Sequence, residues 1–177
     1  MFMLKQKIQS VIRDVPDFPK EGIIFKDITP ILADSTLCFE VVNAFVEELK
    51  GLKVDVIAGV ESRGFLFGMM LANALKVPFV PIRKKGKLPY EVVSYRYDLE
   101  YGSAEVEMHV DAIQKDWNVL VHDDLLATGG TASASAELIK KLGGVVCGFA
   151  FVIELSFLNG KEMLNDYTEN TISLVKY

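Results

Sequence analysis

The chain has 177 residues, of which 50% are hydrophobic, so it can bury a full core, and its length fits one domain (residues 1–177) better than two. Charged residues make up 24% of the sequence and the formal net charge is only -5, which argues against a disordered polyelectrolyte and against a nonspecific nucleic-acid binder. No stretch approaches the roughly 20 apolar residues that span a bilayer, and the N-terminus lacks the apolar block of a secretory signal, so we expect a cytoplasmic protein.

The first 34 residues are predicted to form a helix followed by a cap. Residues 1–15 carry apolar side chains at helical spacing, interrupted by lysine and arginine, which is typical of an amphipathic helix. Residues 15–30 contain three prolines and a glycine around the run Ile23-Ile24-Phe25, too broken for a core element and too apolar for free solvent. We interpret them as a cap that lies over the ligand-binding end of a sheet.

From residue 35 onward, apolar strands alternate with helices. The periodicity predicts helices over 39–49, 64–75 and 131–142, and strands over 54–60, 79–82, 119–121 and 145–153. This alternation predicts an α/β core, a Rossmann-like parallel sheet with helices on both faces and right-handed crossovers. Ligands of such sheets bind beyond the carboxyl ends of the strands.

Residues 83–110 interrupt this alternation with a long polar stretch that contains Gly86, Pro89 and Gly102. Such a stretch predicts a flexible hairpin. Long excursions from compact domains are often lids, so we expect this hairpin to close over the ligand end of the sheet.

The most informative segment follows the strand at 119–121 and runs His-Asp-Asp-Leu-Leu-Ala-Thr-Gly-Gly-Thr into a helix. Gly129 and Gly130 can adopt conformations closed to other residues, and the helix start offers unpaired N–H groups, so the turn suits a monophosphate. Asp123 and Asp124 have the wrong sign for a phosphate, but they can accept hydrogen bonds from the adjacent hydroxyls of a ribose. The alternative is a tight strand-to-helix turn with solvated acids.

This acid-acid, Thr-Gly-Gly-Thr pattern resembles the motif with which the type I phosphoribosyltransferases bind 5-phosphoribosyl 1-diphosphate (PRPP). The resemblance implies the fold of that family, with an N-terminal cap and a hairpin lid. It implies that Asp123 and Asp124 bind the ribose hydroxyls of PRPP or AMP. It also implies five residues that bind the 5′-phosphate: Ala127, Thr128, Gly129, Gly130 and Thr131.

A second loop, Glu61-Ser62-Arg63, follows the strand at 54–60 and precedes a helix, where amides and a guanidinium would converge on a second anion. The family resemblance implies that these three residues bind pyrophosphate, often through a non-proline cis peptide that would fall between Glu61 and Ser62. The alternative for Arg63 is a surface ion pair.

A basic cluster follows the strand at 79–82 and consists of Arg83, Lys84, Lys85 and Lys87. Four like charges so close together repel one another unless an anion gathers them. The resemblance assigns Lys87 and Arg83 to pyrophosphate and suggests that basic residues beside Lys87 serve a neighbouring subunit, hence a homodimer. Simple solvation stays open for Lys84 and Lys85. We expect Mg²⁺ as cofactor, held mainly by substrate oxygens and water, with no protein metal ligands.

The cap sequence resembles one family among the type I phosphoribosyltransferases. Residues 17–30 look like the adenine-binding cap of the adenine phosphoribosyltransferases, and further motifs of that family stand at 61–68, 83–89 and 99–102. With the PRPP motif, the likeness spans nearly the whole chain. The chain departs from the family at Glu21, where a proline is usual, and at His122, where an apolar residue often precedes the acids.

Residues near both the cap and the PRPP motif are the candidates for holding the base, and we favour Phe25 and Leu125. By the family likeness the backbone of Ile24 reads the adenine edge and Phe25 stacks on the ring. Lys26 joins this adenine-binding set at a position where the family often has Arg, which could loosen the cap or shift the affinity for the base. The alternative for Phe25 is an apolar plug under a loop.

Displacement at C1 of PRPP builds positive charge on the sugar and negative charge on the departing pyrophosphate, so the protein needs no nucleophile. Arg63 would neutralise the leaving group, and a lid over residues 89–101 would exclude water. The resemblance places Glu100 and Tyr101 over the reacting atoms, with Glu100 as the candidate that handles the proton on the imidazole ring of adenine. A solvated loop carboxylate is the alternative for Glu100.

The two histidines and two cysteines receive no catalytic or metal-binding role. His109 and His122 lie in or beside predicted strands, where a histidine is more often a core residue than a base. Cys38 and Cys147 are isolated and lack a CxxC motif, so we expect reduced core thiols and no zinc site.

The resemblance therefore implies a purine-salvage pentosyltransferase that converts adenine and PRPP into AMP and pyrophosphate. Two alternatives stay open: a phosphoribosyltransferase for hypoxanthine, guanine, xanthine or orotate, and a non-enzymatic regulator that senses PRPP. The cap sequence argues against the first. The acidic net charge and the short segment before the core argue against the second, and neither nucleic acid nor membrane is expected as a partner.

Overall fold

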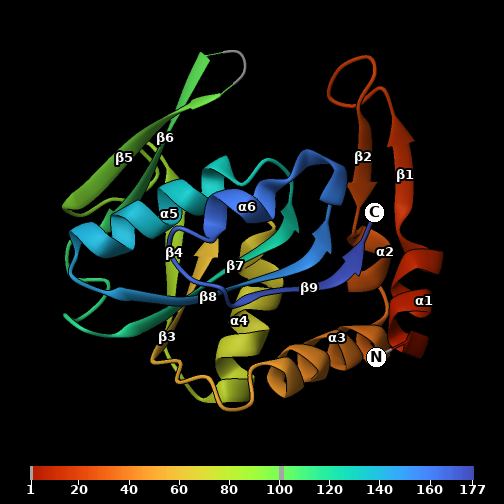
Figure 1. The fold of residues 1–177 in the computed structure, drawn as a ribbon, viewed down its shortest axis with the longest axis horizontal. Helices are drawn as coiled ribbons and strands as arrows, with labels where there is room; N and C mark the ends of the chain where they lie inside the picture. Colours follow the sequence, from red (N-terminus) through yellow and green to blue (C-terminus); the bar gives the residue numbers. More distant parts are fainter. Residues whose placement is uncertain (1, 100–101) are drawn as a thin grey trace.

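The computed structural model describes residues 2–99 and 102–177 and confirms an α/β fold (Figure 1). Its central sheet has the strand order β5-β6-β4-β3-β7-β8-β9, and β1 and β2 form a second sheet. The strands are β1 (Arg13–Pro16), β2 (Ile24–Asp27), β3 (Val56–Val60), β4 (Phe79–Lys84), β5 (Val92–Leu99), β6 (Gly102–His109), β7 (Asn118–Leu126), β8 (Val145–Glu154) and β9 (Thr171–Lys176). The helices are α1 (Phe2–Val11), α2 (Thr29–Leu32), α3 (Ser35–Glu48), α4 (Gly64–Leu75), α5 (Gly130–Lys141), the 3-10 turn η1 (Ser156–Leu158) and α6 (Gly160–Leu164).

The strands β4, β3, β7, β8 and β9 are parallel neighbours, as the alternation of strands and helices predicts. The predicted hairpin region extends this sheet, because β5 and β6 add an antiparallel edge beside β4. The polar stretch after β4 folds back as a hairpin, and a hairpin joins antiparallel strands without a crossover helix.

Helices cover both faces of the sheet. On one face, Phe45 of α3 and Phe67 of α4 are fully buried in the same core as Ile57 of β3. On the other face, Leu138 of α5 shares a second core with Val56 of β3. Successive residues of β3 therefore enter opposite cores, which explains why this strand is a continuous apolar run.

The predicted limits of the helices and strands agree with the structure in some elements and differ in others. α4 spans the predicted residues. α3 begins at Ser35, earlier than the predicted 39, because the Asp34 side chain accepts a hydrogen bond from the Leu37 amide at 3.0 Å and so caps the helix. β7 continues past the predicted end at 121, because its backbone stays paired with β8 as far as Leu126, opposite Glu154.

The cap is a hairpin in which β1 and β2 pair from Arg13 opposite Asp27 to Pro16 opposite Ile24. Figure 1 shows this hairpin and the β5–β6 hairpin rising on opposite sides of the end at which β7 and β8 finish. The predicted cap and the predicted lid region therefore flank the carboxyl ends of the parallel strands, where ligands of such sheets bind.

Cys38 and Cys147 are free and buried, which confirms the prediction of core thiols. Burial raises the pKa of Cys147 to about 12, so this thiol stays protonated. Among residues 2–99 and 102–177, no helix combines the length and the apolar character that crossing a membrane requires.

Candidate active site

The two loops singled out in the sequence lie side by side. β3 and β7 are parallel neighbours with Gly59 opposite His122, so the loop after β3 meets the acids of β7 at one edge of the sheet. α4 starts directly against these acids: a Cβ on Gly64 would lie 2.7 Å from the carbonyl oxygen of His122 and 3.0 Å from the Cα of Asp123. Only a glycine allows this approach.

Asp123 and Asp124 form an acid pair at the end of β7. Asp124 is 2% exposed, its Oδ2 lies 3.0 Å from Nε of Arg63, and its amide donates to Oδ1 of Asp123 at 2.9 Å. Burial, with the charge of Asp124 adding to it, raises the pKa of Asp123 well above its usual value. Burial also raises the pKa of Asp124, against the opposing charge of Arg63. Hydroxyl donors would stabilise the charged forms of both carboxylates.

The turn between β7 and α5 lines a small cavity of about 80 Å³. Its lining includes Asp123 and the whole predicted phosphate loop, residues 127–131. Gly129 has a φ of 87°, in the left-handed region that favours glycine, and this turns the chain into α5. The first amides of α5 have no acceptor within the helix, so they can bind an anion. One side chain reaches this turn from the β5–β6 hairpin: the hydroxyl of Tyr97 lies 3.0 Å from Oγ1 of Thr131.

A larger cavity, of about 600 Å³, opens between the cap and the same turn. All four predicted adenine-binding residues line it: Ile24, Phe25, Lys26 and Leu125. Sequence reasoning missed four further lining residues: Leu155, Phe157, Leu158 and Tyr177. These belong to no chemical motif, and the only available signal was their position just beyond the carboxyl ends of β8 and β9.

Arg63 lies between this larger cavity and the acid pair. Its guanidinium carbon is 4.6 Å from the centroid of the Phe25 ring, and its Nη1 is 3.5 Å from the carbonyl oxygen of Lys26. Its Nε pairs with the buried Asp124. A surface ion pair, the alternative considered for Arg63, does not describe this arrangement, because its carboxylate partner is buried.

Lys26 ties the cap to the rest of the molecule. Its Nζ lies 2.7 Å from Oδ1 of Asp14 and 3.9 Å from the centroid of the Tyr177 ring, and only 11% of the side chain is exposed. Burial, with the charge of Asp14 adding to it, raises the pKa of Tyr177, so the ring stays neutral and offers its π face to the ammonium. The Lys26 side chain therefore joins β1 to the segment after β9.

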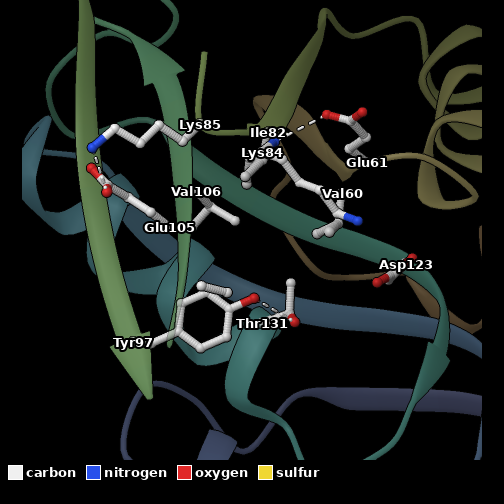
Figure 2. Close-up of a pocket in the computed structure, with 11 residues that line it drawn as sticks. Val60, Glu61, Ile82, Lys84, Lys85, Tyr97, Glu105, Val106, Asp123 and Thr131 are labelled. Carbon is white, nitrogen blue, oxygen red and sulfur yellow. Dashed lines mark hydrogen bonds and ion pairs between the residues drawn. The ribbon is translucent and has the colours of Figure 1, made fainter. Parts of the chain in front are cut away.

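A third cavity, of about 420 Å³, lies between the acid pair and the β5–β6 hairpin (Figure 2). Figure 2 shows Glu61, Lys84, Tyr97 and Asp123 around it, contributed by different elements. The Glu61–Ser62 peptide at its edge is cis, as the family resemblance implies.

Carboxylates of the same chain already neutralise part of the basic cluster. Arg83 donates to Glu61 from Nε at 3.1 Å and from Nη2 at 3.3 Å, which is the main reason why the pKa of Glu61 is lowered. Lys85 pairs with Glu105 at 2.8 Å. Lys87 is exposed and forms no ion pair within the part of the chain that the structure describes, so it is available to an external anion.

His122 is buried in β7, as predicted for a core residue. Burial lowers its pKa to about 4, so the imidazole is neutral at physiological pH. Its ring packs edge-on against Phe45 at a centroid distance of 5.4 Å, and neither ring nitrogen has a hydrogen-bond partner of good geometry among the described residues. Nε2 of His109 is likewise buried without a partner there.

The predicted catalytic residues Glu100 and Tyr101 lie outside the described residues, in the connection between β5 and β6. Their roles stay predictions. In residues 2–99 and 102–177, no group of three or more His, Cys, Asp or Glu side chains is arranged to hold a metal ion.

A family model described as a phosphoribosyl transferase domain matches residues 32–169. A curated adenine phosphoribosyltransferase of Cytophaga hutchinsonii is 51% identical over 175 residues, which cover 99% of this chain and 97% of the relative.

Solved structures agree with this match. The crystal structure of adenine phosphoribosyltransferase from Thermoanaerobacter pseudethanolicus has a TM-score of 0.94 and 50% identity, with 97% of this chain and 99% of that chain covered. The enzyme from Saccharomyces cerevisiae, complexed with D-2,5-dideoxy-2,5-imino-altritol 1,6-bisphosphate and adenine, has a TM-score of 0.91 and 40% identity, with 98% and 99% covered.

Proposed function

Because the chain belongs to the adenine phosphoribosyltransferase family, we propose that it transfers the 5-phosphoribosyl group of PRPP to adenine and releases AMP and pyrophosphate. The observation that carries this proposal is that the turn between β7 and α5 lines two cavities. Leu125, Ala127 and Thr128 line both the larger apolar cavity and the small cavity at the helix start. A base and a 5′-phosphate on the same ribose need neighbouring compartments of this kind.

In this proposal Asp123 and Asp124 bind the ribose hydroxyls. Their raised pKa values support the assignment, because two hydroxyl donors would offset both the burial of the carboxylates and their mutual repulsion. The amides of residues 127–131, with the hydroxyls of Thr128 and Thr131, bind the 5′-phosphate at the start of α5.

Adenine lies in the larger cavity, where Phe25 and Leu125 supply apolar contacts and the backbone of Ile24 faces the amino edge. A backbone N–H can donate to N1 and a carbonyl can accept from N6, whereas a 6-oxo purine presents mismatched groups. Lys26 supports this site through the fold of the cap, since its ammonium is held by Asp14 and Tyr177.

Pyrophosphate departs on the side of the third cavity, bound by Arg63, Lys87, Arg83 and the Glu61–Ser62 loop. Glu61 contributes its backbone, because Arg83 already binds its carboxylate. Mg²⁺ would neutralise the diphosphate when bound, and substrate oxygens and water would supply most of its ligands. Asp123 lines both the small cavity and the third cavity, so a ribose bound to its carboxylate would lie between the 5′-phosphate and the departing diphosphate.

The β5–β6 hairpin closes over the reacting atoms, with Glu100 handling the proton of adenine and Tyr101 beside it. Glu100→Gln should lower kcat by about 100-fold or more with little change in the KM for adenine, because a general acid or base acts mainly in the transition state. An unchanged kcat in a steady-state assay would remove this role.

We further propose a cytoplasmic homodimer. α4 supports the dimer, because Leu66 and Met69 on its outer side are 43% and 47% exposed, and exposed apolar side chains along one helix suit a protein interface.

A spectrophotometric assay tests the function. AMP should form from adenine, PRPP and Mg²⁺, and hypoxanthine, guanine, xanthine and orotate should react at least about 100-fold more slowly as judged by kcat/KM. A preference for one of those bases would favour a related transferase. PRPP binding without turnover of any base would favour a regulator.

A further inference from the structure

Gly160, the first residue of α6, lies in direct contact with the backbone of the phosphate loop. A Cβ on Gly160 would collide with the carbonyl oxygen of Ala127 and would lie 2.9 Å from both the amide nitrogen of Gly129 and the carbonyl carbon of Thr128. The contact is mutual, since a Cβ on Gly129 would lie 2.6 Å from the carbonyl oxygen of Gly160. Two glycines therefore let two backbone segments touch.

The conformation of Gly160 does not itself require glycine. Its φ lies outside the left-handed region, unlike that of Gly129, and it occupies a helical position where alanine has the higher intrinsic propensity. The atoms that a side chain would meet belong to the backbone, so they cannot rotate away as the end of a long side chain could. The approach of the phosphate loop is thus the reason for a glycine here.

The segment that carries Gly160 is fixed on both sides. The amide of Leu155 donates to the carbonyl of Leu126 at 2.9 Å, which continues the pairing of β8 with β7. The amide of Asn159 donates to Ser156 at 3.1 Å, and Leu164 at the end of α6 is fully buried in the core under α5. A side chain at position 160 would therefore press on the phosphate loop from a segment that is held on both sides.

We propose that Gly160 is a positioning residue for the 5′-phosphate: α6 supports residues 127–131 through a backbone contact that any side chain would break. The inference rests on the proposed phosphate-binding role of this loop. The proposal adds a residue that lies outside the loop, about thirty positions further along the chain. Gly160 would shape the turn without touching the ligand.

Titration of the full chain with ribose 5-phosphate and, separately, pyrophosphate tests the proposal. Gly160→Ala should bind ribose 5-phosphate at least about tenfold more weakly, because the loop amides no longer converge, and should bind pyrophosphate like the wild type. In steady state the KM for PRPP should rise while the KM for adenine stays within about twofold. Equal affinity of wild type and variant for ribose 5-phosphate would overturn the proposal.

Gly148→Ala is the matched control. Gly148 also lacks a left-handed φ and is also crowded, with Leu120 Cδ1 at 3.0 Å and the Asn170 carbonyl oxygen at 3.1 Å, but it lies in β8 away from the loop. The Gly148→Ala variant should have a lower Tm than the wild type and an unchanged affinity for ribose 5-phosphate. Parallel losses of Tm and affinity in both variants would show a general loss of stability and would overturn the positioning role.

Hydrogen exchange of the wild type supplies a measurement that needs no variant. Ribose 5-phosphate should slow exchange in residues 127–131 and also in residues 160–164, because the two segments touch; no slowing in α6 would contradict the proposal. Thr131→Val tests the phosphate-binding role of residues 127–131 separately from the positioning role of Gly160. If it leaves the affinity for ribose 5-phosphate unchanged, the phosphate-loop assignment fails, and the role of Gly160 fails with it.

Discussion

Asp123 is a residue whose charge works against the stability of the fold. Its carboxyl group lies beside Asp124 and is partly buried, and its pKa is raised first by burial and then by the charge of Asp124. An unfolded aspartate titrates near pH ~3.9, so above that value the unfolded chain gives up its proton before the folded chain does. The folded state then holds more protons, and stability falls as the pH rises toward the raised pKa.

Asp123→Asn should therefore raise Tm by a few degrees at pH ~7, because it removes a charge that the folded state accommodates poorly. The gain should vanish below pH ~4, where both states are protonated. Differential scanning calorimetry across this range measures it. Binding of ribose 5-phosphate should weaken at the same time, which separates ligand affinity from stability.

Asp55 provides the opposite case within the same chain. It accepts hydrogen bonds from the Asn118 backbone amide at 2.8 Å and from the Asn118 side chain at 2.7 Å, and the backbone bond is the first cause of its lowered pKa. Asp55→Asn should accordingly lower Tm at neutral pH. A lower Tm for both variants would contradict the argument from charge burial.

At the scale of elements, the β5–β6 hairpin is fixed to both ends of α5, one of which adjoins the phosphate loop. Lys141 donates to the carbonyl of Ser94 at 2.8 Å and lies over the ring of Tyr95 at 5.1 Å. Tyr97 reaches the start of the helix and shares a hydrogen bond with Thr131. The base of the predicted lid is thus attached to the element whose N-terminus is proposed to bind the 5′-phosphate.

Tyr97→Phe should raise the KM for PRPP about threefold to tenfold, the effect of one neutral hydrogen bond, with the KM for adenine unchanged. Tyr95→Phe is the control, since the Tyr95 ring contacts Lys141 and its hydroxyl makes no hydrogen bond among the described residues. A similar effect of both variants on the KM for PRPP would show that the hydroxyl of Tyr97 has no specific role.

Elements with a strong local signal could be predicted from the sequence, and elements set by distant pairing could not. The α4 helix is apolar along almost its whole length, and its predicted limits are confirmed. β7 could not be delimited, because its acidic residues resemble a loop, although the backbone there still pairs with β8, Asp123 opposite Phe151. Tertiary pairing overrides local preference at this point.

The candidate site likewise contains residues that a local pattern reveals and residues that only the tertiary fold brings in. Few kinds of site combine glycines, threonines and acids in a fixed pattern, so the β7–α5 turn could be found in the sequence. Phe157 and Tyr177 are ordinary aromatic residues that line the larger cavity only because β8 and β9 end beside the cap. The pairing of Arg63 with Asp124 likewise depends on the adjacency of β3 and β7, which no local pattern encodes.

At the scale of the whole molecule, α4 leaves apolar side chains on its outer side while its inner side fills the core. Met69→Glu should convert the proposed dimer into a monomer, because a carboxylate in the centre of an apolar interface would lose its hydration without gaining a partner. Light scattering after size exclusion gives the mass. Met163→Glu on α6 is the control, since Met163 is 45% exposed, close to the 47% of Met69. A wild-type mass of one chain would contradict the dimer.

The double use of the turn after β7 limits how this enzyme can be redesigned. If the proposed sites are right, substitutions at Leu125, Ala127 or Thr128 would disturb binding of the 5′-phosphate together with that of the base, because those residues line both cavities. β2 and η1 line the base compartment alone. A search for variants that accept other nucleobases should therefore randomise Ile24 and Phe157 and leave the glycine-rich turn intact.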